Sequence, residues 1–260
     1  MLDRTPQPVR FASDQAYSCY RSLSQAPCFQ LRLARHWSDL THLRLARIRL
    51  LPPPDSPLRL PALTALTALA HLRSVHIDDF DTEHVRGAAL YSLPTTVATL
   101  NLNDYGVYTN PAFATILRTD LARRGTSLRE LALLDDNLKG DRGSLQGVVR
   151  GVYGSVLPSL TNLRLLAISP CAVADLATSL APLAPLKNLA ELTLQQGFGI
   201  VELRLEPVEL QLYLEASPVG LREVRVSDGV SEGWGARRKV ALEEVARRKG
   251  VQARWCDVSM

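Results

Sequence analysis

The fold of this chain is decided by the stretch Leu163-Arg164-Leu165-Leu166-Ala167-Ile168-Ser169-Pro170-Cys171. Its first, fourth and sixth positions are apolar, and this spacing returns along most of the chain. The further copies lie at Leu40/Leu43/Leu45, Leu72/Val75/Ile77, Val97/Leu100/Leu102, Leu128/Leu131/Leu133, Leu189/Leu192/Leu194 and Leu221/Val224/Val226. Successive copies begin 25 to 35 residues apart, so the chain contains an internal repeat of irregular length.

Each copy is short and alternating, which predicts a β-strand and not a helix. Positions 4 and 6 of the copy point to the same side of such a strand. One unit cannot bury this apolar side alone, so neighbouring units must stack against one another. The pattern predicts a parallel sheet lined with leucine side chains, with a last strand where Val251, Ala253 and Trp255 alternate.

The segments between copies are long enough to return along the outer surface. Helical spacing of apolar residues predicts helices at residues 111–124, 144–157, 175–183 and 235–248. Residues 52–70 begin with three prolines and continue with leucines three apart, which indicates a loop and then a short helical or 3₁₀ turn. Residues 200–214 alternate around Pro207, which predicts a β-hairpin inserted between two units.

The repeat resembles that of leucine-rich repeat proteins of the irregular, ribonuclease-inhibitor-like kind. The resemblance covers residues 40–258 and implies an α/β solenoid, shaped like a horseshoe. Parallel strands would form its concave face, and helices or irregular segments its convex face. Residues 40–260 would form the repeat domain. Residues 1–39 carry no copy and would form an N-terminal cap within the same structural domain.

The ninth position of the repeat departs from this family's pattern. It is usually Asn or Cys, whose side chain hydrogen-bonds the loop backbone, and only Cys171 fits here. Uneven repeat lengths and the missing ladder resemble the degenerate arrays that are attached to F-box domains. That resemblance implies substrate recognition in a ubiquitin-ligase complex, although residues 1–39 show no recognisable F-box.

Composition favours a globular protein of 260 residues, with 46% apolar residues and a net charge of +4. No apolar run reaches the roughly 18 residues that a membrane helix needs. The first ten residues do not read as a secretory signal, so we expect a cytoplasmic or nuclear protein. Its four cysteines, Cys19, Cys28, Cys171 and Cys256, are then expected to be free thiols.

We expect no catalytic, metal or cofactor site. His71 and His76 are five residues apart, and neither has a Cys or acidic neighbour at metal-ligand spacing. Gly147, Gly151 and Gly154 lie inside a helical pattern and are not followed by the Lys-Ser or Lys-Thr of a phosphate loop. The chain is therefore not expected to be an enzyme.

Positions 3, 5 and 7 of each unit are expected to face solvent from the concave side of the sheet. The candidate partner-binding residues among them are His76, Asp78, Asn101, Asn103, Glu130, Leu134, Leu165, Glu191, Thr193, Gln195, Glu223 and Arg225. Acidic residues outnumber basic ones in this set. Leu134, Leu165 and Ala167 would form an apolar patch that could anchor a partner side chain.

Position 8 adds carboxylates near one rim of the sheet, at Asp79, Asp104, Asp135 and Asp228. They are interpreted as caps of backbone N–H groups, as a rim that attracts a basic partner segment, or as both. An acidic rim makes nucleic acid an unlikely ligand for the concave face, because phosphates are repelled there.

The leading hypothesis is a non-catalytic protein–protein interaction module, either a monomer or a subunit of a complex. One alternative is nucleic-acid or phosphate binding through an Arg-rich N-terminal or convex surface. Its residues would be Arg32, Arg35, Arg44, Arg47 and Arg49. Another alternative is a non-catalytic subunit of an enzyme complex.

Overall fold

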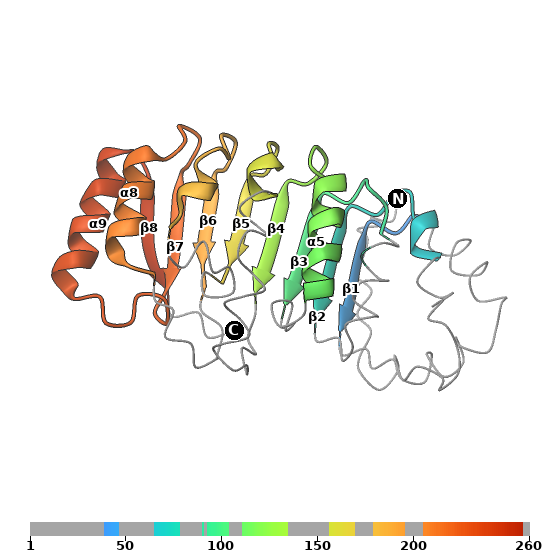
Figure 1. Cartoon of the computed structure of the whole chain (residues 1–260), viewed down its shortest axis with the longest axis horizontal. Coiled ribbons are helices and arrows are strands. Elements are labelled where there is room, and N and C mark those ends of the chain that lie inside the picture. The colour runs from blue at the N-terminus through green and yellow to red at the C-terminus, as the bar shows by residue number, and fades with distance from the viewer. Residues whose placement is uncertain are drawn as a thin grey trace, which may run out of the picture.

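A computed structural model describes residues 39–46, 65–78, 90, 93–103, 111–134, 156–169, 179–195 and 205–256. Within these ranges eight strands pair in chain order, each parallel to the next, to form one sheet (Figure 1). The strands are β1 His42–Ala46, β2 Ser74–Asp78, β3 Thr99–Asn103, β4 Glu130–Leu134, β5 Leu165–Ile168, β6 Glu191–Leu194, β7 Glu223–Ser227 and β8 Gln252–Cys256. Every copy of the repeat supplies one strand and β8 is the predicted last strand, so the chain is a parallel solenoid.

The strand register places equivalent repeat positions side by side. Leu131 of β4 pairs with Leu100 of β3 and with Leu166 of β5. All three are fully buried. The apolar positions of the other copies, from Leu72 to Val226, are also buried. Burial of each such side chain stabilises the fold by roughly 1.5–3 kcal/mol. The predicted leucine-lined spine is therefore confirmed. The strands stay in register although the repeats differ in length.

Three α-helices occur in the described residues: α5 Pro111–Arg123, α8 Pro207–Ala216 and α9 Ala236–Arg248. They cover one face of the sheet (Figure 1). α5 buries Leu117 and Leu121, and α9 buries Leu242, Val245 and Ala246 against the leucine spine. The helices predicted at residues 111–124 and 235–248 are thus confirmed.

The hairpin predicted at residues 200–214 is wrong, because residues 207–216 form α8. Pro207 stands at the first helical position, where its fixed φ and missing N–H favour a helix start. Leu210, Tyr213 and Leu214 follow at helical spacing and are buried. Val208 and Leu212 produced the apparent alternation, yet they lie on the outer side of the helix and are more than half exposed.

Short 3₁₀ turns occur in the described parts of three connections. They are η1 Ala65–Ala68, η2 Leu157–Ser159 and η4 Ala181–Leu183. η1 confirms the 3₁₀ alternative for the leucines of residues 52–70, and η4 shows that the predicted helix at 175–183 does not extend to its end. The rest of the helices expected at 144–157 and 175–183 lies outside the described residues, as does the cap expected at residues 1–39, apart from Asp39.

A buried arginine at the end of α5 forms an ion pair within this segment and hydrogen bonds to the connection that precedes β3. Arg124 Nε lies 2.6 Å from Asp120 Oδ2, and both side chains are fully buried. Arg124 Nη2 also donates to the carbonyl of Leu93 at 3.1 Å, and Nη1 donates to the carbonyl of Pro94. These bonds fix the end of α5 against the preceding unit, because a buried guanidinium needs an acceptor for each donor group.

Candidate functional site

The open face of the sheet carries two rows of side chains that the register aligns across the strands. The row at position 3 contains His42, Ser74, Thr99, Glu130, Leu165, Glu191, Glu223 and Gln252. The row at position 5 contains Arg44, His76, Asn101, Ala132, Ala167, Thr193, Arg225 and Arg254. All of these side chains are half-buried or exposed. Eight of the twelve predicted site residues are thus brought together on one surface.

The other four predicted site residues are not shown on that surface. Leu134 is only 6% exposed and Gln195 only 8%, so the prediction that they face solvent is wrong. Both stand at position 7, where the strand ends and the alternation of sides stops. At the equivalent Ser227, the turn that follows β7 folds back, and Ser231 N–H donates to the Ser227 carbonyl at 3.1 Å. Asp78 and Asn103 pair in register at the ends of β2 and β3, but their side chains lie outside the description.

Charges on the face are balanced, which corrects the expected excess of acids. The described face carries Glu130, Glu191 and Glu223 against Arg44, Arg225 and Arg254. The prediction left out β1 and β8, which extend the face and supply two of these arginines.

Glu223 is the centre of an ion-pair network at the carboxy-terminal end of the face. Its Oε1 accepts from Arg225 Nε at 2.8 Å and lies 3.0 Å from Arg254 Nε. The hydrogen bond from Arg225 lowers the pKa of the Glu223 carboxyl below its ordinary value, and the charges of both arginines act in the same direction. Glu191 lies 3.8 Å from Arg225, a longer contact. Glu223 is therefore engaged within the protein, whereas Glu191 is more available to a partner.

The position 5 row has short side chains at the centre of the face. Ala132, Ala167 and Thr193 are neighbours in the position 5 row. Leu165 stands beside them in the position 3 row, half-buried between Glu130 and Glu191. The predicted apolar patch therefore exists without Leu134.

The carboxylate rim predicted at position 8 is described at Asp228 alone, because Asp79, Asp104 and Asp135 lie outside the described residues. Asp228 is exposed, and its Oδ1 lies 3.9 Å from Lys239 Nζ of α9. Both interpretations of the rim therefore stay predictions.

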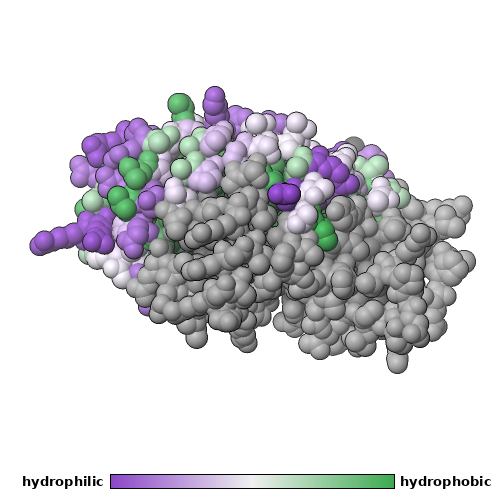
Figure 2. Space-filling model, viewed as in Figure 1, coloured by the Kyte–Doolittle hydropathy of each residue, from purple (hydrophilic) through white to green (hydrophobic). Residues whose placement is uncertain are grey.

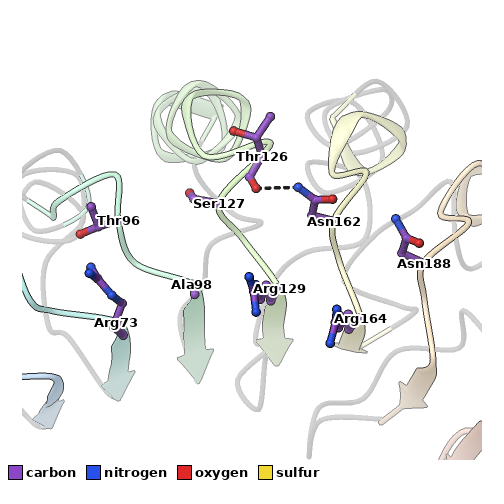
Figure 3. Close-up of a pocket in the computed structure, with 9 residues that line it drawn as sticks. All are labelled: Arg73, Thr96, Ala98, Thr126, Ser127, Arg129, Asn162, Arg164 and Asn188. Carbon is purple, nitrogen blue, oxygen red and sulfur yellow. Dashed lines mark hydrogen bonds between the residues drawn. The ribbon is translucent and has the colours of Figure 1, made fainter.

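A second surface, which was not predicted, follows the edge of the sheet where the strands begin. It is a groove of about 620 Å³, lined by Arg73, Thr96, Ala98, Thr126, Ser127, Arg129, Asn162, Arg164 and Asn188. In Figure 3 the three arginines stand in a row just before β2, β4 and β5, and the Asn and Thr side chains lie on the turns above them. The signal in the sequence is Arg at position 2 of these units.

Side-chain hydrogen bonds hold the turns of this edge together. Asn162 Nδ2 donates to the Thr126 carbonyl at 2.7 Å, and Asn188 Nδ2 donates to the Thr161 carbonyl at 2.7 Å. Each bond crosses from one unit to the unit before it. Position 9 largely lacks the side chains that hydrogen-bond the loop backbone in leucine-rich repeats. Here the residue that directly precedes the unit forms such bonds and satisfies loop carbonyls.

The described residues contain no group of three or more His, Cys, Asp or Glu side chains placed to hold a metal ion. Of the four cysteines the description includes Cys256, a half-buried free thiol. No helix in the described part of the chain is long and apolar enough to cross a membrane. Of the arginines suggested for an N-terminal phosphate-binding surface, Arg44 alone is described, on the open face of β1.

No protein-family model matches the chain, and no curated protein matches its sequence. Among solved structures, it is similar to the leucine-rich repeat-containing protein LegL7 from Legionella pneumophila. That similarity has 13% sequence identity and a TM-score of 0.37, and it covers 74% of this chain and 68% of LegL7. The fold of the chain is defined by its own strand order and register, with one parallel strand from each repeat.

Proposed function

We propose that the chain is a non-catalytic protein-recognition module that binds a partner protein across the open face of its sheet. The observation that carries this proposal is the pair of aligned rows, which presents side chains from strands far apart in sequence on one continuous surface. Repeat proteins of this architecture use such extended surfaces for binding. The leucine-rich repeat resemblance of the sequence supports the same function.

The partner segment is expected to carry an apolar side chain next to a basic one. Leu165 offers an apolar contact at the centre of the face, and Ala132 and Ala167 leave room beside it. Glu130 and Glu191 flank Leu165 in the same row and would pair with a Lys or Arg of the partner. Buried anchors near the centre of an interface contribute most of its affinity, and flanking charges improve its specificity and association rate.

A photo-crosslinking amino acid at position 165 tests this proposal directly. The control places the same group at Val240 of α9, which is 61% exposed and lies away from the face. In extracts from the native source, we expect a defined protein to be crosslinked from position 165 and not from position 240. Equal labelling from both positions, or labelling from position 240 alone, would contradict the proposal.

A charge reversal gives an independent check. Glu130→Lys with Glu191→Lys should abolish capture of the protein that position 165 identifies. Glu232→Lys with Glu244→Lys changes the net charge equally at exposed sites off the face and should leave capture intact. Similar loss in both double variants would indicate a general charge effect and not a specific site.

Substrate recognition in a ubiquitin-ligase complex is a narrower form of this proposal. It is supported only by the resemblance of the repeats to F-box-associated arrays. Co-purification of ligase subunits with the chain would favour it, and a crosslinked partner unconnected with ubiquitin transfer would argue against it.

A further inference from the structure

We propose that the groove along the strand-start edge binds an extended acidic peptide segment of a protein, at a site separate from the open sheet face. Three cations line this groove, at Arg73, Arg129 and Arg164, and no carboxylate is among its described lining residues. An unneutralised row of like charges repels itself, so an anionic ligand is favoured there.

The arginines are available to a ligand. All three side chains are exposed. Within the part of the chain that the structure describes, neither Arg129 nor Arg164 forms an ion pair or a side-chain hydrogen bond. Arg73 donates from Nη1 to the carbonyls of Ala70 and Leu72, at 3.1 and 3.4 Å. Because both acceptors are neutral, they do not compensate the positive charge of Arg73. Guanidinium groups in this condition bind carboxylates with two parallel hydrogen bonds.

The backbone fixes the spacing of these cations. Arg164 N–H donates to the Arg129 carbonyl at 2.7 Å, so these two residues stand on adjacent strands. Ala98 lies between Arg129 and Arg73 and bonds to both through the backbone. At about 4.8 Å per strand, Arg73 and Arg164 are roughly 14 Å apart. A single phosphate or carboxylate cannot bridge that distance, so the ligand must be extended and carry several negative charges.

The groove fits a peptide better than a nucleic acid. It reaches from Arg73 to Asn188, four strand spacings or roughly 19 Å, which matches an extended segment of about six residues. Acidic side chains at alternate positions of such a segment would lie on one side, about 7 Å apart. None of the described lining residues is aromatic, so bases would find no aromatic stacking surface.

Hydrogen bonds within the protein hold the turns of the groove in place. Asn162 and Asn188 tie their turns to the preceding units, and Thr96 Oγ1 donates to the carbonyls of Ala70 and Leu72. A preformed site loses less conformational entropy when a ligand binds. The upper margin of Figure 2, where these turns lie, is mostly hydrophilic to neutral, as a site for a charged segment requires.

Fluorescence anisotropy with a seven-residue peptide that carries Glu at alternate positions tests the proposal. The same peptide with Gln in place of Glu is the neutral probe, and a six-residue oligothymidylate of similar length is the nucleic-acid probe. We expect the Glu peptide to bind and the Gln peptide not to bind. The combined variant Arg73→Gln, Arg129→Gln and Arg164→Gln should weaken binding on the order of tenfold or more.

The matched control combines Arg237→Gln, Arg238→Gln and Arg248→Gln on α9, which are exposed and give the same net charge. It should bind the Glu peptide as the unmodified chain does. A second variant, Ala98→Glu, keeps all three arginines, places a carboxylate between two of them and should also block the peptide. No binding of the Glu peptide, equal weakening by both triple variants, or tighter binding of the oligothymidylate would overturn the proposal.

Discussion

Replacement of Arg124 by methionine is expected to be one of the most destabilising single changes in the described part of the chain. The guanidinium contacts Asp120 through two hydrogen bonds, at 2.6 and 3.1 Å, and it donates to the carbonyls of Leu93 and Pro94. Both members of the ion pair are fully buried. Removal of one partner leaves the other charge without its main compensation, which costs about 3–5 kcal/mol.

A double variant separates the stranded charge from the lost carbonyl contacts. Arg124→Met combined with Asp120→Leu removes both buried charges, so the loop carbonyls lose the Arg124 donor and the partly exposed Arg123 loses its carboxylate partner. We expect that double variant to lose about 1–3 kcal/mol, less than Arg124→Met alone. Together with the single variant Asp120→Leu, these values give the coupling energy of the buried pair.

Urea unfolding followed by circular dichroism measures these free energies. Arg123→Met is the control, because Arg123 contacts the same carboxylate at 2.5 Å but its side chain is 38% exposed. It should cost no more than about 1 kcal/mol. If Arg124→Met proved as mild as Arg123→Met, the pair would not be buried and α5 would not be anchored as described.

Three further changes follow from burial and charge. Tyr213 is buried, and its hydroxyl has no hydrogen-bond partner among the described residues, so Tyr213→Phe should leave the unfolding free energy unchanged or raise it by up to about 1 kcal/mol. Leu166→Ala should cost about 2–5 kcal/mol in the same assay, because Leu166 is fully buried, whereas Leu212→Ala should cost much less, because Leu212 is 53% exposed. Arg225 lowers the pKa of Glu223 from 4.5. The ionised Glu223 carboxylate therefore contributes fully to stability above pH 4.5, and this contribution is lost as the pH falls through the lowered pKa. An NMR titration should place the Glu223 midpoint below 4.5, and Glu223→Gln should remove this part of the acid sensitivity; a midpoint at or above 4.5 would contradict the network.

The sheet could be predicted from the sequence because its signal is local and repeated. Leu163, Leu166 and Ile168 define one unit, and the same spacing in the other units identified β1 to β7, while alternation alone identified β8. α8 was missed because Val208 and Leu212, exposed on a helix, imitate the alternation of a strand. Helical spacing of Pro207 with the buried residues that follow it carried the correct signal.

The binding surfaces were predictable only in part, because they depend on pairing between distant units. The face of the sheet on which Leu165 lies follows from alternation within its own strand. Leu134 was misplaced because the prediction continued the alternation to the last residue of the strand, where Leu134 is buried. The arginine row at Arg73, Arg129 and Arg164 becomes visible only when strand pairing is known, because its successive members are 56 and 35 positions apart in the sequence.

The most direct test of the account is the register between β4 and β5, because both proposed surfaces depend on it. Cysteines introduced at Ala132 and Ala167, which are register partners, should lie about 4.8 Å apart and form a disulfide on oxidation, identified by peptide mass spectrometry. The pair Ala132→Cys and Ile168→Cys is one residue out of register, with side chains on opposite faces, and should remain reduced. Efficient bridging of the second pair, or failure of the first, would contradict the stacked parallel sheet.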